Sequence, residues 1–150
     1  MLELRDVDDV LLPGDADARA ELQEVLKSRT EKERSYAALW LYMTSTRLGE
    51  DGKVAVRPYL PSGSRPAWPY PVLQYVMGDV DLAQAERGAE ENGKTDSGRL
   101  CELYFFLGQE QLLKGERNRA RSYFNKSVNT RVIEFQEYGF SQRELSLMGS

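Results

Sequence analysis

Acidic residues are the most abundant side chains in this sequence that could carry proton-transfer or metal chemistry. The chain has 24 Asp and Glu residues, one cysteine and no histidine. The lack of histidine excludes Ser-His-Asp and Cys-His nucleophile pairs, His-containing zinc sites and histidine acid–base catalysis. A hydrolase that uses a pair of carboxylates stays open as an alternative, although no spacing singles out two of the acids.

Three short motifs have part of the pattern of a ligand site. Asp15 and Asp17 form an Asp-x-Asp pair, as do Asp79 and Asp81. A calcium loop also needs a further ligand, a glycine and a distal glutamate, and these are missing at the required spacing. The stretch "GEDGKV" has the wrong glycine–lysine spacing for a phosphate loop and no Ser or Thr after its lysine. We therefore expect no metal and no cofactor.

Cys101 is expected to be a structural residue. Its position in an apolar helical run favours a small buried hydrophobe over a reactive thiol. As the single cysteine of the chain, it has no partner for an intramolecular disulfide.

Composition indicates a folded, soluble protein. The 150 residues are 41% hydrophobic and 29% charged, which suits one ordinary domain. The net charge of −4 argues against general nucleic-acid binding, which needs an excess of Lys and Arg. No stretch approaches the roughly 18 apolar residues of a membrane span. The first residues, "MLELRDVDDVLLPGD", have acids where a signal peptide has a basic start and an apolar centre.

Charge is distributed unevenly along the chain. Residues 1–24 contain eight acids and two bases, whereas residues 114–131 contain six bases and one acid. Either these are two solvated helix faces, or the basic segment binds an acidic partner, which could be the acidic leader of another copy. In the second interpretation, the binding residues of this basic helix are Arg117, Arg119 and Arg121.

Helical periodicity runs through most of the chain, and no convincing alternating strand pattern is present. Residues 1–14 are expected to be an irregular leader. Gly49 or Gly52 would end the second helix, Pro71 suits the first turn of the third, Gly78 would end that helix, and Gly115 would end the fifth. The expected helices cover residues 16–29, 31 to Gly49 or Gly52, 72–78, 80–92, 99–114 and 134–148. A further helix is expected after Gly115, with Ala120, Tyr123, Phe124, Ser127 and Val128 on one face.

A proline-rich loop should separate the first two helices from the rest. Residues 58–71 contain five of the six prolines, and proline denies the backbone both helix geometry and a hydrogen-bond donor. Because Trp68 and Tyr70 have large apolar areas to bury, the loop is expected to dock on the fold. Binding to a partner is the alternative.

Residues 101–134 resemble one 34-residue tetratricopeptide repeat (TPR). With Cys101 as position one, Gln111 and Val132 depart from the pattern, while Ser127 supplies an expected small residue. Gly78 and Ala83 have the same separation as Gly115 and Ala120, which suggests a weaker earlier repeat. The positions that match and have structural roles are Tyr104, Leu107, Gly108, Gly115, Ala120 and Phe124.

The small residues of this repeat predict a close crossing of two antiparallel helices. A glycine inside a helix costs about 1 kcal/mol relative to alanine, so Gly108 needs a packing reason. We expect that a side chain at Gly108 would push against the helix that contains Ala120.

A longer resemblance covers roughly residues 35–149. The order of "ALWLY", a Trp-containing loop, "QYVMGD", "CELYFFLGQEQLLKGERNRARSYFNKSV" and the closing "FQEY…ELSLMG" is similar to the C-terminal half of NlpI-type TPR lipoproteins. This resemblance implies a helical-repeat homodimer anchored to the bacterial outer membrane. It also implies an adaptor that brings a periplasmic protease and peptidoglycan hydrolases together. A periplasmic or outer-membrane location would require an upstream lipoprotein signal, and a cytoplasmic location is expected otherwise.

The sequence therefore predicts an all-α fold of TPR-like helical hairpins, a short α-solenoid with a C-terminal capping helix. Residues 15–150 are expected to form a single such domain. The expected function is a non-enzymatic scaffold or adaptor that binds a protein or peptide. A self-associating assembly unit, such as a homodimer, is the main alternative.

By resemblance to TPR peptide grooves, partner contacts are expected on the inward face of helix 99–114. In this hypothesis Phe105 and Phe106 are exposed apolar anchors. The alternative is that both rings are buried by the Trp68 loop or by the last helix. The residues of this expected groove are Glu102, Phe105, Phe106, Gln109 and Leu113.

Overall fold

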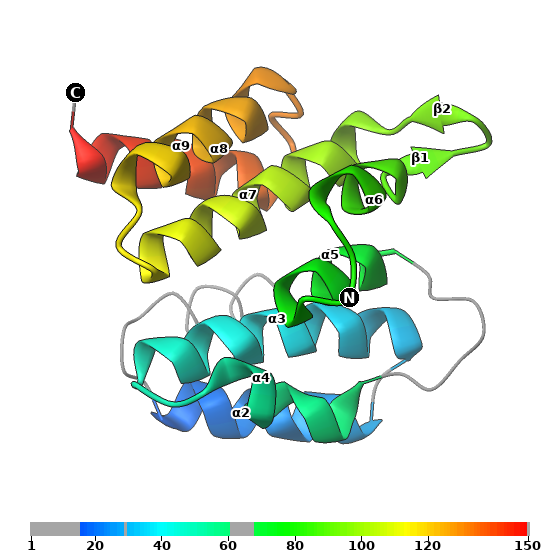
Figure 1. The fold of residues 1–150 in the computed structure, drawn as a ribbon, viewed down its shortest axis with the longest axis vertical. Coiled ribbons are helices and arrows are strands. Elements are labelled where there is room, and N and C mark those ends of the chain that lie inside the picture. Colours follow the sequence, from blue (N-terminus) through cyan, green and yellow to red (C-terminus); the bar gives the residue numbers. More distant parts are fainter. Residues whose placement is uncertain (1–15, 29, 61–67, 150) are drawn as a thin grey trace. The chain divides into compact units, whose positions relative to one another are not determined.

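The computed structural model describes residues 16–28, 30–60 and 68–149, and these are mostly helical (Figure 1). The described residues form eight α-helices, one 3-10 helix and one very short hairpin. The expected all-α class is therefore confirmed. Residue contacts divide the chain into two compact units, Met1–Asp79 and Val80–Ser150, and each is described by itself.

The first unit is built around the long helix α3 (Glu31–Arg47). Thr30 begins it by accepting a hydrogen bond from the Glu33 amide, as a good N-cap residue does. Helix α3 packs against three other α-helices among the described residues of this unit. These are α2 (Ala16–Ser28), α4 (Gly52–Val56) and α5 (Tyr70–Met77).

The core of the first unit comes mainly from the middle of α3. An unbroken run from Ala37 to Ser45 is buried, which is wider than one apolar stripe and requires neighbours on several sides. Trp40 is among the largest fully buried side chains. Trp68 is also buried, which agrees with the expectation that this residue docks on the fold. Residues 61–67 of the same loop lie outside the described part of the chain.

A short helical segment after α3 was not predicted. Helix α3 ends before Gly49, which has a φ of 84°. Asp51 then caps α4 by accepting hydrogen bonds from the amides of Lys53 and Val54, and the 3-10 helix η1 (Arg57–Tyr59) follows. Two predictions about helix α5 are confirmed: Pro71 lies in its first turn, and Gly78 ends it with a φ of 87°.

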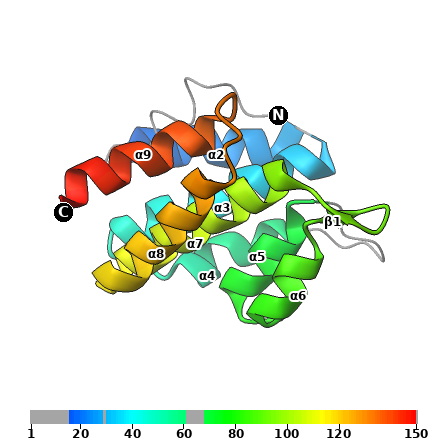
Figure 2. The same cartoon turned by 90° about the horizontal axis from the view of Figure 1, so that it is seen from above.

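The second unit contains four helices and the hairpin, of which α7, α8 and α9 form a packed three-helix array (Figure 2). Helix α6 contacts this array through α7, where the Tyr104 hydroxyl donates a hydrogen bond to Glu86 of α6. The elements are α6 (Leu82–Arg87), β1 (Glu90–Glu91), β2 (Lys94–Thr95), α7 (Ser97–Leu113), α8 (Arg117–Asn129) and α9 (Gln136–Met148).

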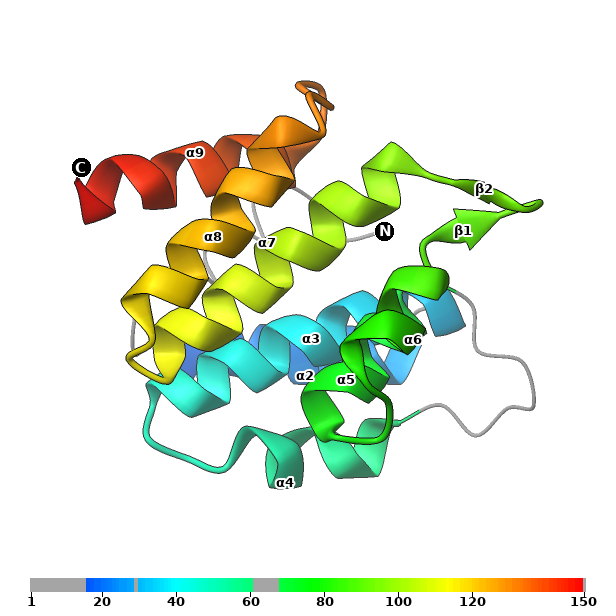
Figure 3. The same ribbon diagram turned by 45° about the horizontal axis from the view of Figure 1, so that its top comes forward.

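The helix expected over residues 80–92 is too long, because α6 ends at Arg87 and the hairpin β1–β2 follows (Figure 3). Asn92 and Gly93 connect the strands, both with positive φ, which is the backbone that a tight two-residue hairpin turn requires. The strands are too short to show an alternating pattern. Asp96 then begins α7 by accepting a hydrogen bond from the Arg99 amide.

The core of the second unit is rich in aromatic rings. Phe105 of α7 lies 6.3 Å from Phe124 of α8 and 5.8 Å from Phe140 of α9, measured between ring centroids. One ring from each helix therefore meets at the centre of the array. Gly115 has a φ of 79° and separates α7 from α8 as expected.

Helices α7 and α8 approach closely at Gly108. A Cβ atom at this position would lie 2.5 Å from Cε1 of Phe124, closer than atoms can pack. The expectation that Gly108 faces the following helix is confirmed, although the obstacle is Phe124 and not Ala120, which is buried one turn earlier. Ala83, the small residue expected in the weaker repeat, lies on the exposed side of α6.

Candidate functional site

The residues of the expected groove are covered in this structure. Glu102, Phe105, Phe106 and Gln109 are all buried, and Leu113 is half-buried. Phe105 contacts Phe106 edge-on as well as the rings from α8 and α9. The position of Phe105 thus agrees with the alternative in which the last helix covers the ring. The two phenylalanines are not exposed anchors.

The three arginines of the basic helix α8 do not share one face. Arg117 donates a hydrogen bond to the carbonyl of Met148 in α9, with an Nη2–O distance of 2.9 Å. Arg121 follows one turn later, so it lies on the same side of α8, and it is half-buried. Arg119 is two residues from Arg117, roughly 200° around the helix, and is exposed.

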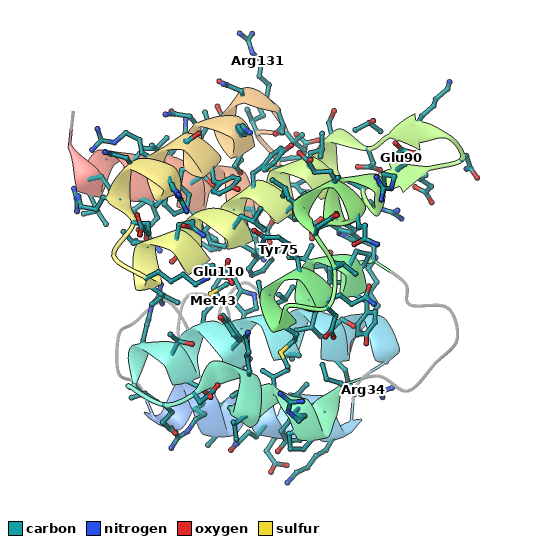
Figure 4. All side chains as sticks on the ribbon, in the orientation of Figure 1. Arg34, Met43, Tyr75, Glu90, Glu110 and Arg131 are labelled. Carbon is teal, nitrogen blue, oxygen red and sulfur yellow. The ribbon has the colours of Figure 1, made fainter. Side chains whose placement is uncertain are left out.

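Arg119 shares its side of α8 with Lys126, because seven residues make two helical turns. Both side chains are exposed, and so is Arg131, which extends outward from the turn after α8 (Figure 4). In the described part of the chain no carboxylate forms an ion pair with any of the three. We call Arg119, Lys126 and Arg131 the basic surface.

A cluster of polar and aromatic side chains beside this surface was missed by sequence reasoning. Tyr104 of α7 and Tyr123 of α8 stack with centroids 6.2 Å apart and planes 16° apart. The Tyr104 hydroxyl donates to Oε2 of Glu86 in α6 at 2.6 Å. The Lys126 ammonium lies 5.4 Å from the Tyr104 ring centroid and 5.6 Å from that of Tyr123. We call these four residues the tyrosine cluster.

The surroundings of the tyrosine cluster keep both phenols protonated. Burial and the nearby Glu86 carboxylate raise the pKa of Tyr104 far above its ordinary value. Burial also raises the pKa of Tyr123, with added effects from Glu86 and Glu110. A negative charge close to a phenol opposes the loss of its proton. The cluster therefore presents neutral rings beside a carboxylate.

Tyr104 was predicted only as a structural position of the repeat. Its spacing from Tyr123 and Lys126 does follow from two paired helices, so the ring stack could have been inferred from the repeat. The position of Glu86 beside Tyr104 could not have been inferred, because no local sequence pattern places α6 against this part of α7.

Cys101 is buried between α7 and α8, where it contacts the polar side chain of Ser127. Its Sγ lies 3.4 Å from Ser127 Oγ, and Ser127 donates to the Cys101 carbonyl at 2.8 Å. Burial raises the pKa of the Cys101 thiol, and nearby Glu137 and Glu102 add to this effect. The prediction that Cys101 is a buried structural residue agrees with its full burial.

Glu137 is a buried carboxylate in the first turn of α9. Desolvation by burial raises its pKa above the ordinary value, against the opposing effect of hydrogen bonds from backbone and Gln136. Through the described ranges, no group of three or more Cys, Asp or Glu side chains is arranged to hold a metal ion. Over the same ranges, no helix combines the length and apolar character that crossing a membrane requires.

Comparison with known proteins does not identify a family for this chain. No family model matches the sequence, and no solved structure matches it at a significant level.

Proposed function

We propose that this chain is a non-enzymatic scaffold or adaptor that binds a protein with an acidic surface. The observation that carries this proposal is the basic surface: three exposed cations on α8 and in the turn after it, with no ion-pair partner in the described part of the chain. Uncompensated charges of one sign raise the rate and the specificity of binding to a partner of the opposite sign.

The packing of α7 on α8 supports a TPR-like architecture for this module. Gly108 allows the close crossing, Ala120 and Phe124 are buried at it, and Gly115 provides the turn. By its resemblance to NlpI-type lipoproteins, the partner would be a protease or a cell-wall hydrolase of a bacterial envelope. The acidic-partner proposal does not depend on that resemblance.

Charge reversal on the basic surface tests this proposal. Capture of partners from a native extract by immobilised wild type would be compared with capture by the double variant Arg119→Glu/Arg131→Glu. The matched control is Arg57→Glu/Lys94→Glu, which reverses two exposed charges elsewhere. We expect the first variant to lose the salt-dependent capture of acidic partners, and the control variant to keep it. Equal capture by the two variants would contradict the proposal.

Self-association is a second candidate, favoured by the opposite charges of residues 1–24 and 114–131. In this alternative the acidic segment of one copy would contact the basic surface of another. Sedimentation of wild type over a range of protein and salt concentrations separates the two functions. A salt-sensitive dimer that Arg119→Glu/Arg131→Glu abolishes would favour self-association, whereas a monomer throughout would exclude it.

A further inference from the structure

The tyrosine cluster has the chemistry of a cation site that the chain fills with its own lysine. The faces of Tyr104 and Tyr123 carry the negative side of the ring quadrupole, which attracts ammonium and guanidinium groups. The Lys126 ammonium lies within 6 Å of both ring centroids, the range in which this attraction acts. Its position shows where a cation is favoured.

Fixed negative charge strengthens this site. The Tyr104 hydroxyl donates to Glu86, so the carboxylate is held at the edge of the ring stack. Helix α6 brings Glu86, α7 brings Tyr104, and α8 brings Tyr123. Because a side chain from each of three helices contributes, the arrangement is built by tertiary packing and does not depend on one mobile surface residue.

Lys126 is a displaceable occupant of this site. It is exposed, and in the described part of the chain no carboxylate forms an ion pair with it. Its four-carbon stem leaves the ammonium free to move to water at little cost. Lys126 also belongs to the basic surface, so an ammonium that leaves the rings can turn toward an acidic partner.

We propose that Tyr104, Tyr123 and Glu86 bind a lysine or arginine side chain of a partner protein, which displaces Lys126 from the two rings. This inference rests on the proposed function, since it specifies how a protein partner is recognised. The partner would present a cation for the tyrosine cluster and acidic groups for the basic surface. Such a pairing of opposite charges sets the orientation of the complex.

The site itself is tested on the purified chain with tetramethylammonium chloride as the probe. Tyrosine ring signals are followed by NMR during the titration, with sodium chloride at equal ionic strength as the reference. Lys126→Met keeps an apolar stem and removes the competing charge. We expect this variant to bind the probe about two- to fivefold more tightly than wild type, the strength of one exposed cation–π contact.

Two further variants must weaken the binding. Tyr104→Leu removes one ring, and Glu86→Gln keeps a hydrogen-bond acceptor while it removes the charge. Each is expected to lower the affinity about twofold or more. If Tyr104→Leu fails to fold, Tyr123→Leu takes its place. Equal affinity in wild type, Lys126→Met and Glu86→Gln would overturn the inference, as would signal changes that spread evenly over tyrosines outside the cluster.

A competition experiment with short peptides tests whether the site binds a lysine side chain as well as a free ammonium compound. The peptide acetyl-Gly-Lys-Gly-amide should compete with tetramethylammonium for the same ring signals, whereas acetyl-Gly-Gln-Gly-amide should not. Lack of competition by the lysine peptide would overturn the assignment to a protein side chain.

Failure of this inference differs from failure of the proposed function. Probe binding needs no partner, so the site can bind while Arg119→Glu/Arg131→Glu still captures every partner, which would contradict only the acidic-partner proposal. The opposite result, lost capture with no probe binding, would contradict only the cation site.

Discussion

The Phe124 ring occupies the space that a side chain on Gly108 would need. Three atoms of the ring lie within 2.5 to 2.9 Å of the position of a Cβ on Gly108. The ring is fully buried and lies beside Phe105, so it has little room to move away. This contact explains why α7 contains a glycine as its twelfth residue.

Substitution of Gly108 should therefore reverse the usual effect of replacing a helical glycine. In an exposed helix, Gly→Ala stabilises by about 0.5–1 kcal/mol. We expect Gly108→Ala to lower the free energy of unfolding by roughly 1–3 kcal/mol because it overpacks the crossing. Gly139 in α9 is the matched control, since a Cβ there meets no atom within 4 Å. Chemical denaturation of both variants measures the two effects, and equal changes would contradict the close crossing.

Phe105→Ala should destabilise the fold. The ring is fully buried among Phe106, Phe124 and Phe140, and truncation of a buried phenylalanine costs about 3–5 kcal/mol. Leu147→Ala is the control, because Leu147 is 74% exposed; a change within about 0.5 kcal/mol is expected. A folded Phe105→Ala variant of nearly wild-type stability would contradict the burial of the ring and would support its role as an exposed anchor.

Glu137→Gln should stabilise the chain at neutral pH and lose this advantage in acid. Burial raises the pKa of Glu137 in the folded state, so the folded state binds the proton more tightly than the unfolded state. The contribution of this group to stability is therefore lost as pH rises from the unfolded pKa through the folded one. Glutamine has no proton to lose and escapes this penalty.

The measurement is the difference in unfolding free energy between Glu137→Gln and wild type across the range from acid to neutral pH. The difference should grow as pH rises. Glu134→Gln, on an exposed residue of the preceding turn, controls for the change in net charge. A difference that is constant with pH would show that Glu137 does not titrate differently in the two states.

Cys101 should react slowly with a disulfide reagent such as dithionitrobenzoate until the chain unfolds. Burial raises the pKa of the thiol and shields it from reagents, and the thiolate is the reactive form. The labelling rate in buffer should be far below the rate in denaturant, and it should rise in Gly108→Ala if that variant opens the same helix pair more often. Equal rates in buffer and denaturant would contradict the burial.

Local sequence determined where most helices begin and end. Capping residues, prolines and glycines act on the backbone within a few residues of their own position. Here these are the caps Thr30 and Asp96, Pro71 in a first turn, and Gly78 and Gly115 after helix ends. Their effects do not depend on the rest of the fold, so the pattern alone predicted α5 and α7 to within about two residues at each end. The small residue at position 108 likewise predicted a close helix crossing, because glycine in a helix needs a packing reason.

Only the tertiary structure decided which side chains are available to a partner. Helical spacing left open whether Phe105 and Phe106 are exposed, whereas in the fold both are buried and Phe105 contacts one ring from α8 and one from α9. Arg117 and Arg119 are neighbours in sequence, yet contact with α9 takes only Arg117 away from the basic surface. Glu86 reaches Tyr104 across eighteen residues. Burial and charge pairing depend on residues that other helices bring close by packing. The periodicity of one helix does not identify those residues.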